Sequence, residues 1–319
     1  MAEKVVVTGG AGFIGSQIVR GLLAQGVERV NVIDNFYSGK RENLAEVASL
    51  VDIHDMDAGD YDRVRPIVEG ASRVFHLAAI PSVPKSILAP VPSHVANIDA
   101  TFHLFRACAD GKVGRVVYAA SSSAYGDTEV LPKTESMAPN PKSPYAAQKL
   151  MGEYYGRIFT ECFGLEVVSL RFFNVYGPRQ DPNSPYSGVI SIFMKCLLQG
   201  SQPTLFGDGE QSRDFTYVED VANLCLKASR APGVAGKIFN AGNGNRYTLK
   251  EVWKTLNKIE GRRIEPLFGP PRAGDVRDSQ ADTAAARREL KHDPQFSLEE
   301  GLRRTLEWYR VAEAQPVTV

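Results

Sequence analysis

Two side chains on one segment have the types and the spacing needed for proton transfer. Tyr145 and Lys149 are four residues apart, and Pro144 suits the first turn of a helix, so both side chains would project from one helical face. A lysine held beside a phenol lowers the pKa of the phenol. We therefore predict that Tyr145 acts as a phenolate general base near neutral pH. The same spacing also occurs on solvated helix faces, and only the surroundings distinguish the two interpretations.

Three consecutive hydroxyl side chains precede this pair. Ser121, Ser122 and Ser123 follow the run Arg115–Ala120, which predicts a buried strand that ends at the serines. In parallel sheets, ligands bind at the carboxyl ends of the strands. A hydroxyl from this run would relay or steer the proton that Tyr145 removes. The alternative is that the serines only form a turn by bonding their own backbone.

A glycine-rich turn at the start of the chain predicts a phosphate-binding site. Val5–Thr8 predicts a short buried strand, and three glycines lead from it into the helical pattern of Ser16–Gln25. Gly9 permits a tight turn, Gly12 lets the backbone approach a pyrophosphate, and Gly15 lets the helix pack closely on the strand. The N–H groups at the helix start would then bind the phosphates of a dinucleotide. The alternative is a structural strand–turn–helix connection that binds no ligand.

An acidic residue follows the glycines at the distance along the sequence that is expected for dinucleotide binding. Asp34 ends the strand pattern Val30–Ile33. Its carboxylate can accept hydrogen bonds from both ribose hydroxyls and would repel a 2′-phosphate, so NAD is favoured over NADP. Lys40 and Arg41 lie close enough in the sequence to temper this preference.

The next strand pattern, Val74–Ala79, ends in small residues that would let a nicotinamide ribose lie against the backbone. His76 in its middle is predicted to be a core histidine and not a general base. Pro81–Pro92 is rich in proline and serine and predicts a loop. A helix is predicted over Ser93–Ala109. On that helix Asn97 has two open interpretations, since it can reach the cofactor or serve as a buried amide between packed helices.

Composition excludes several classes of function. Lys and Arg together number 37, as do Asp and Glu, so net charge gives no indication of nucleic-acid or membrane-surface binding. The four cysteines are far apart, show no metal-ligand pairing and suit a reducing compartment. The chain passes from Met1 almost directly into a predicted strand, and no apolar run approaches membrane-spanning length. A soluble cytoplasmic protein without a metal site is therefore expected.

Strand and helix patterns alternate, which predicts an α/β protein built on a Rossmann-type, doubly wound parallel sheet with a smaller C-terminal lobe. Residues 1–176 are expected to form the NAD-binding domain, with residues 214–242 returning to it. Residues 177–213 and 243–319 are expected to form a substrate-binding lobe.

Taken together, the motifs resemble the extended short-chain dehydrogenase/reductase family and, within it, the nucleotide-sugar epimerases, above all bacterial UDP-N-acetylglucosamine 4-epimerases. The matching segments follow the family's order along nearly the whole chain: Thr8–Ser16, Asp34–Asn35, Asp57–Ala58, His76–Ala79, Ser121–Gly126, Tyr145–Lys149, Arg171–Pro178, Gly207–Asp220 and Arg272–Asp275. The resemblance implies reversible C4 epimerisation of a UDP-hexose through a transient 4-keto sugar, with tightly bound NAD.

The resemblance also implies a set of cofactor contacts. Asp57 and Ala58 would hold the adenine end of NAD, and Lys149 would bond the nicotinamide ribose. The whole expected cofactor set is Gly9, Gly12, Phe13, Ile14, Gly15, Asp34, Asn35, Ser38, Gly39, Asp57, Ala58, Leu77, Ala78, Ala79, Asn97, Ala119, Tyr145, Lys149 and Phe172.

On the substrate side the resemblance implies that Asn174 and Arg213 contact the UDP-sugar, while Arg272 and Asp275 bind its phosphate and uridine ribose. Physical chemistry agrees about the arginines, because a pyrophosphate needs bidentate cationic partners and the helix start is already used for NAD. The alternative for Arg272 is an ordinary exposed arginine. The whole expected substrate set is Ser82, Ser121, Ser122, Ser123, Tyr145, Asn174, Val189, Arg213, Arg272, Asp275 and Ser279.

Two features bear on the reaction and the sugar. Ser121 occupies the family's catalytic position and Ser122 is the adjacent candidate. Where dehydratases and decarboxylases of the family carry an acid, this chain has only the serines, which favours epimerisation. Ser279 stands where related epimerases place a side chain beside the C2 substituent of the sugar. A serine leaves room for an acetamido group, so UDP-GlcNAc and UDP-GalNAc are favoured, with UDP-Glc and UDP-Gal also converted. The alternative is that Ser279 is an ordinary polar position.

Other activities and assemblies stay open at this point. A UDP-glucuronate 4-epimerase or an NADH-dependent 4-keto-sugar reductase would use the same tyrosine and lysine. A non-catalytic NAD-binding regulator is a more distant alternative, because such relatives usually lack the pair. Relatives dimerise through two helices per subunit, here Ser93–Ala109 and Tyr145–Cys162, whose apolar surface could equally be internal core.

Overall fold

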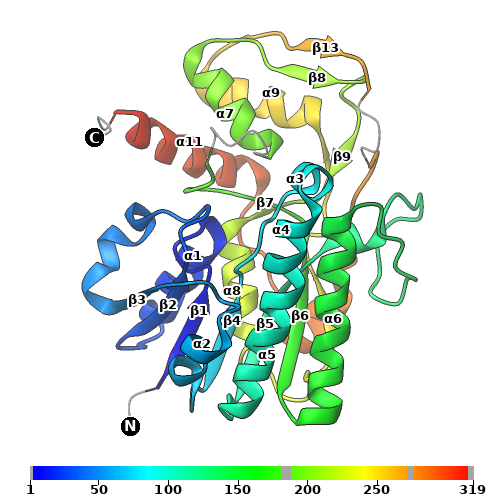
Figure 1. The fold of residues 1–319 in the computed structure, drawn as a ribbon. Coiled ribbons are helices and arrows are strands. Elements are labelled where there is room, and N and C mark those ends of the chain that lie inside the picture. The colour runs from blue at the N-terminus through cyan, green and yellow to red at the C-terminus, as the bar shows by residue number, and fades with distance from the viewer. Residues whose placement is uncertain (1–2, 182–187, 272–275, 315–319) are drawn as a thin grey trace.

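The computed structural model describes residues 3–181, 188–271 and 276–314. Its centre is a seven-stranded sheet in the order β11-β6-β5-β4-β1-β2-β3, with every neighbouring pair parallel (Figure 1). The strands are β1 Val5–Thr8, β2 Val30–Asp34, β3 Val51–Asp55, β4 Arg73–His76, β5 Arg115–Ser121, β6 Glu166–Phe172 and β11 Ile238–Ala241. The strand order reverses between β1 and β4, which opens a crevice at their carboxyl ends. The predicted Rossmann-type α/β fold is confirmed.

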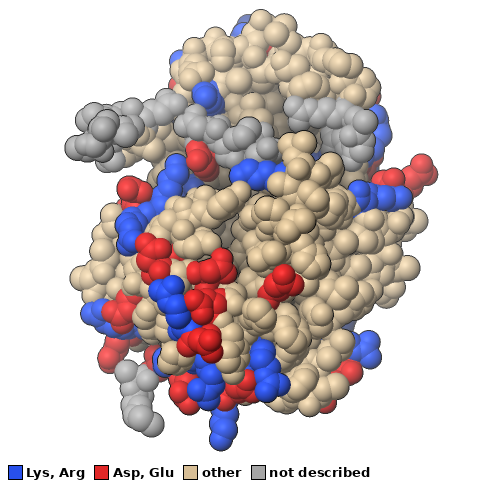
Figure 2. Space-filling model, viewed as in Figure 1, with Lys and Arg blue, Asp and Glu red and all other residues tan. Residues whose placement is uncertain are grey.

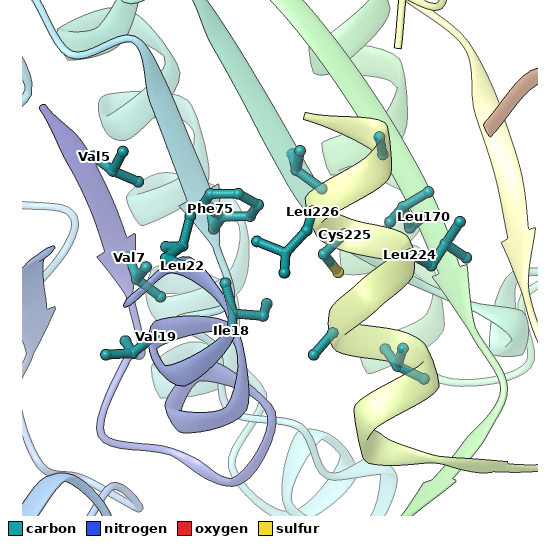
Figure 3. Close-up of a cluster of buried hydrophobic side chains, with 14 of the residues drawn as sticks. Val5, Val7, Ile18, Val19, Leu22, Phe75, Leu170, Leu224, Cys225 and Leu226 are labelled. Atoms are coloured by element: carbon teal, nitrogen blue, oxygen red, sulfur yellow. The ribbon is translucent and has the colours of Figure 1, made fainter. Parts of the chain in front are cut away.

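Helices cover both faces of this sheet because successive strand residues point to opposite sides. Val5 and Val7 pack against the helices of one face, and Val6 packs against those of the other. The first face holds α1 (Phe13–Ala24) and α8 (Val218–Ala228), whose buried side chains are drawn in Figure 3. The second face holds the helices α2 Tyr61–Val68, α5 Ala100–Asp110 and α6 Pro144–Phe163.

The loop predicted over Pro81–Pro92 is wrong, because this segment contains two short helices. They are α3 (Val83–Leu88) and α4 (Pro90–His94). Pro84 of α3 and Pro90 of α4 occupy the first two helical positions, where the missing N–H costs no hydrogen bond, and Ser82 caps α3. Helix α4 then continues through a π-helical turn, η2 (Val95–Asp99), into α5, so the predicted helix begins earlier than expected.

A second lobe lies over the carboxyl ends of the sheet strands (Figure 1). Its apolar cluster draws on the helices α7 Val189–Gln199, α9 Leu249–Glu260 and α11 Leu298–Ala314. Three two-stranded sheets complete it or connect it to the large sheet: β7 Asn174–Tyr176 with β10 Phe215–Tyr217, β9 Ser212–Arg213 with β12 Tyr247–Thr248, and β8 Thr204–Phe206 with β13 Leu267–Gly269. The remaining elements are the 3₁₀ helices η1 Arg41–Leu50 and η3 Ser122–Tyr125, and the helix α10 Ala284–Leu290.

The chain crosses between the two parts more than once. After β7 it enters the lobe, and α8 and β11 then return to pack on α1 and pair with β6. The division into residues 1–176 with 214–242, and residues 177–213 with 243–319, stays our prediction. Across the residues that the structure describes, none of the helices has the length and apolar character to cross a membrane.

Candidate active site

One large cavity of about 1400 Å³ lies where the lobe faces the carboxyl edge of the sheet. It exceeds the roughly 300–1,000 Å³ that holds a single drug-sized ligand, so it has room for two nucleotides. Its walls come from the glycine turn, the ends of β2, β4 and β5, the start of α6 and the lobe.

The glycine turn has no room for side chains. Gly9 adopts φ +67°, and a Cβ there would lie 2.7 Å from the Ala78 nitrogen. A Cβ on Gly15 would lie 2.1 Å from the Gly9 carbonyl oxygen, so the first turn of α1 rests directly on the strand-to-helix turn. No side chain caps α1 at Gly12. The N–H groups of its first turn are thus left for an anion in the cavity.

Asp34 is buried at the end of β2 with room for further hydrogen bonds. Its Oδ2 accepts from the Ala11 N–H and its Oδ1 from the Phe36 N–H, both at 2.9 Å. Each carboxylate oxygen keeps a second acceptor site, which suits the two hydroxyls of a ribose. Burial raises the pKa of Asp34, and the two backbone N–H groups oppose that rise. A Cβ on Gly39 would lie 2.8 Å from Oδ1, so the loop after β2 wraps closely around the carboxylate.

The structure brings the other expected cofactor residues to this cavity, with one exception treated below. They are Phe13, Ile14, Asn35, Ser38, Asp57, Ala58, Leu77, Ala78, Ala79, Ala119, Tyr145, Lys149 and Phe172. An uncapped helix start, a glycine cradle and a buried carboxylate fit the pyrophosphate and ribose of a dinucleotide.

Tyr145 lies in the first turn of α6, close enough to the side chain of Ser121 at the end of β5 to interact with it. The Ser121 Oγ accepts from the Ser123 N–H at 3.2 Å and from the Ser123 hydroxyl at 2.8 Å. The sequence predicted that Lys149 lowers the pKa of Tyr145. In the chain itself that pKa is raised, because burial outweighs the Ser121 hydrogen bond, which lowers it. Further positive charge beside the phenol is needed to form a phenolate near neutral pH.

Lys149 is buried one helical turn further along α6. Its ammonium donates to the Ala119 carbonyl oxygen at 2.8 Å and lies 5.0 Å from the centre of the Tyr118 ring. Burial lowers the pKa of Lys149 to about 8. His76 bonds Thr8 at 2.8 Å and Thr101 at 2.9 Å, and burial lowers its pKa to about 3. It is thus a neutral core histidine.

The structure favours the second of the two interpretations of Asn97. This residue is fully buried in the π-helical turn. Its Oδ1 accepts from the Ile80 N–H at 2.7 Å, and its Nδ2 donates to Gln148 at 2.8 Å. Because protein partners occupy both ends of the amide, the expected cofactor contact of this side chain is replaced by a structural one.

Arg213 and Ser279 are brought together on the lobe side of the cavity. The Ser279 N–H donates to the Ser212 carbonyl oxygen at 3.1 Å, next to Arg213. The carboxylate of buried Asp214 accepts a hydrogen bond from the Ala281 N–H at 3.0 Å. This bond also holds the segment that contains Ser279 close to Arg213. The other expected substrate residues at the cavity are Ser82, Ser121, Ser122, Ser123, Tyr145 and Asn174.

Three expected substrate residues are not placed at the cavity. Val189 begins α7 and packs on the apolar cluster of the lobe, because it belongs to the buried face of that helix. Arg272 and Asp275 lie outside the described residues.

The cavity also contains charged residues that sequence reasoning missed. Lys133 is buried, and its ammonium donates to the carbonyl oxygens of Thr128 and Val130. No spacing marks a lysine in a loop, so nothing in the sequence signals its burial. Arg179 has φ +73° and pairs with Glu46 at 3.2 Å. Its place directly after Gly177-Pro178 was the available signal, since a turn there leads out of the sheet.

The glycine turn, the buried carboxylate and the tyrosine–lysine pair define a dinucleotide-dependent enzyme of the short-chain dehydrogenase type. The chain belongs to the NAD dependent epimerase/dehydratase family, whose profile matches residues 5–242. NAD is therefore its cofactor, as the carboxylate of Asp34 predicts.

Proteins of known structure and known activity resemble nearly the whole chain. A UDP-glucose 4-epimerase of Mycolicibacterium smegmatis is 38% identical over 311 residues, which cover 96% of this chain and 98% of that protein. The UDP-N-acetylglucosamine 4-epimerase from Methanobrevibacter ruminantium, solved with UDP-N-acetylmuramic acid, has 38% identity and a TM-score of 0.93, covering 98% of this chain and 100% of that one. The Thermus thermophilus UDP-glucose 4-epimerase, solved with NAD, has 37% identity and a TM-score of 0.88, covering 97% and 99%.

Proposed function

We propose that this protein inverts C4 of UDP-hexoses, interconverting UDP-GlcNAc with UDP-GalNAc and also UDP-Glc with UDP-Gal. The observation that carries the proposal is that Tyr145, Ser121 and Lys149, whose ammonium donates to the Ala119 carbonyl oxygen, line one cavity together with Arg213 and Ser279. Family membership and the similarity to two kinds of UDP-sugar 4-epimerase support the same reaction.

In this reaction the residues of the chain move one proton. Tyr145 removes the proton of the C4 hydroxyl as a general base and returns it when the carbonyl is reduced on its other face. Ser121 donates a hydrogen bond that stabilises the phenolate, and the Lys149 ammonium adds positive charge nearby. Bound NAD supplies the oxidation and the reduction at C4. The transient 4-keto sugar rotates in the site between the two steps, which inverts C4. Because the reduction reverses the oxidation, the cycle has no net redox change.

The end of β5 supports epimerisation over elimination. Ser121, Ser122 and Ser123 line the cavity there. Dehydration or decarboxylation needs a further acid beside the sugar, and three hydroxyls do not provide one.

The choice of sugar rests on Ser279. The relatives at 38% identity include both a UDP-glucose and a UDP-N-acetylglucosamine enzyme, so overall similarity does not decide the substrate. Ser279 is a small side chain beside Arg213, and it leaves space for an acetamido group at C2. The Ser279→Tyr variant should lose far more activity on UDP-GlcNAc than on UDP-glucose. Equal losses on the two substrates would contradict this assignment.

The test of the whole proposal is incubation of purified protein with UDP-GlcNAc, UDP-Glc or UDP-GlcA, without added cofactor, followed by identification of the sugars. We expect many turnovers to UDP-GalNAc and UDP-Gal. Preferred conversion of UDP-GlcA would identify a glucuronate epimerase, and stoichiometric use of NADH would identify a reductase. Unchanged sugars even with NAD⁺ supplied would identify a non-catalytic protein.

A homodimer through α5 and α6 is part of the proposal. Helix α3 exposes Ile87 and Leu88, α5 exposes Phe102, and α6 exposes Met151, Tyr154, Ile158 and Phe163. In Figure 2 most of the surface over these helices carries no charge. A contiguous apolar surface of this kind supports docking of a second copy. Ile158→Asp should give a monomer by light scattering, and a monomeric wild type would contradict the dimer.

The four free cysteines support the cytoplasmic location expected from their spacing.

A further inference from the structure

Gln148 lies on α6 between the two residues that carry the chemistry, Tyr145 and Lys149. Its Oε1 accepts from the Ser93 hydroxyl at 2.8 Å and from the Asn97 Nδ2 at 2.8 Å. All three side chains of this link are at most 4% exposed. Leaving a buried polar group unpaired costs more free energy than a hydrogen bond contributes when it forms. The link between Ser93, Asn97 and Gln148 is therefore held in one geometry.

Asn97 extends this link to the loop after β4. Its Oδ1 accepts from the Ile80 N–H at 2.7 Å, and its Nδ2 also donates to the Ile80 carbonyl oxygen at 3.2 Å. Ile80 lines the cavity directly after Ala78 and Ala79, where the dinucleotide is expected. Asn97 belongs to the π-helical turn η2, an insertion that is often found at functional sites.

A second buried contact joins the same two parts of the chain. The Tyr145 N–H is one of the N–H groups at the start of α6 that lack a partner within the helix. It donates to the Ser86 Oγ at 3.1 Å, and Ser86 is fully buried in α3. The Ser86 hydroxyl in turn donates to the Val83 carbonyl oxygen at 2.7 Å. Helix α6 is thus hydrogen-bonded to the segment between β4 and α5 at two places, Tyr145 and Gln148.

We propose that Gln148 is a positioning residue. Its side-chain carbonyl oxygen, held by Ser93 and Asn97, fixes the position of α6 relative to the segment between β4 and α5. It thereby sets the distance of Tyr145 and Lys149 from the cofactor side of the cavity. The inference rests on the proposed function, because it assigns Tyr145 and Lys149 their catalytic roles. A displacement of about 1 Å at reacting groups can lower a rate by roughly a hundredfold. Gln148 itself touches no reacting atom.

The test compares Gln148→Leu with a matched control on the same helix. Leucine keeps much of the volume but leaves the Ser93 hydroxyl and the Asn97 amide without their acceptor. Arg157→Leu is the control, since it removes a long side chain and its bond to Glu161 from the exposed face of α6. Both variants are assayed with UDP-Glc and UDP-GlcNAc, and NAD content and thermal midpoint are measured on the same samples.

For Gln148→Leu we expect kcat to fall roughly ten- to a hundredfold while KM for the UDP-sugar stays nearly constant. The acid limb of the kcat profile should move to higher pH, because a displaced Tyr145 loses its interaction with the Ser121 side chain, which lowers its pKa. Gln148→Glu keeps an acceptor oxygen and should recover most of kcat. In Gln148→Leu, amide hydrogen exchange should become faster at the first turn of α6 and over residues 80–88, whether or not substrate is present. Arg157→Leu should change none of these quantities.

Three results would overturn the inference. The first is a Gln148→Leu enzyme with wild-type kcat and pH profile. The second is a loss of thermal stability in Gln148→Leu with kcat unchanged, which marks a purely structural amide. The third is a Ser93→Ala/Gln148→Leu double variant whose loss is the full product of the two single losses, because residues that act through one contact must be non-additive. A wild-type protein inactive on every UDP-sugar would instead reject the proposed function, whereas amide exchange would still report on the link.

Discussion

The Ser123 hydroxyl donates a hydrogen bond to the Ser121 Oγ at 2.8 Å, and the Ser123 N–H donates to the same oxygen at 3.2 Å. Both acceptor positions of the Ser121 Oγ are thus used, which leaves its own hydrogen to be donated, and the Ser121 side chain lowers the pKa of Tyr145. The three serines that the sequence left equivalent are therefore not equivalent in geometry. Ser123 orients Ser121, and Ser121 contacts the general base.

Alanine substitutions at the serines should separate these roles. Ser121→Ala removes the hydrogen bond that lowers the pKa of Tyr145, so kcat should fall roughly a hundredfold and the acid limb of its pH profile should move upward. Ser122→Ala should have little effect on either quantity. Steady-state kinetics of both variants across pH check this. A larger loss in Ser122→Ala would move the proton relay to that residue.

The Lys149 ammonium predicts an alkaline limb in the activity. Burial lowers its pKa to about 8, so the side chain is charged below that pH and becomes neutral above it. Neutralisation removes a positive charge one helical turn from Tyr145 on α6. We expect kcat/KM for UDP-Glc to fall as pH rises through about 8. Activity that stays constant up to about pH 10, the ordinary range of a lysine, would show that the charge is not needed.

The buried ion pair between α6 and β6 should behave as a unit. Glu153 and Arg171 are almost completely buried, and their two hydrogen bonds measure 2.9 and 2.7 Å. Glu153→Leu leaves the guanidinium uncompensated and should cost about 3–5 kcal/mol of unfolding free energy. The double variant Glu153→Leu/Arg171→Met should cost less than the sum of the two single changes. Denaturant unfolding of the cofactor-stripped proteins measures both. Additive losses would show that the two charges do not interact.

Much of the fold follows from patterns that act locally. The β-branched runs, Gly9 and Gly15, and Asp34 at the end of β2 each meet a steric or electrostatic demand that one residue type satisfies, so sequence alone predicts the sheet and the dinucleotide turn. Alternating strand and helix patterns predict a parallel sheet covered on both faces, whereas the order of its strands comes from the structure.

Other features depend on partners far apart in the chain. Asn97 turns to Ile80 and Gln148 because a π-helical turn rotates it inward, and no spacing rule signals that insertion. The proline-rich stretch that contains Pro84 and Pro90 predicts a loop, although each of these prolines occupies the start of a helix. The pKa of Tyr145 was expected to be low because of one neighbour, whereas burial by the whole fold raises it. Burial and long-range partners are tertiary properties, and a sequence pattern does not contain them.

In the proposed reaction, the hydrogen removed from C4 returns to C4 of the same sugar. UDP-Glc carrying deuterium at C4 tests it directly when the purified protein is incubated with it in ordinary water, without added cofactor. We expect UDP-Gal that retains the deuterium at C4, formed over many turnovers. Deuterium lost to solvent, or product formed only in step with consumed NADH, would contradict it.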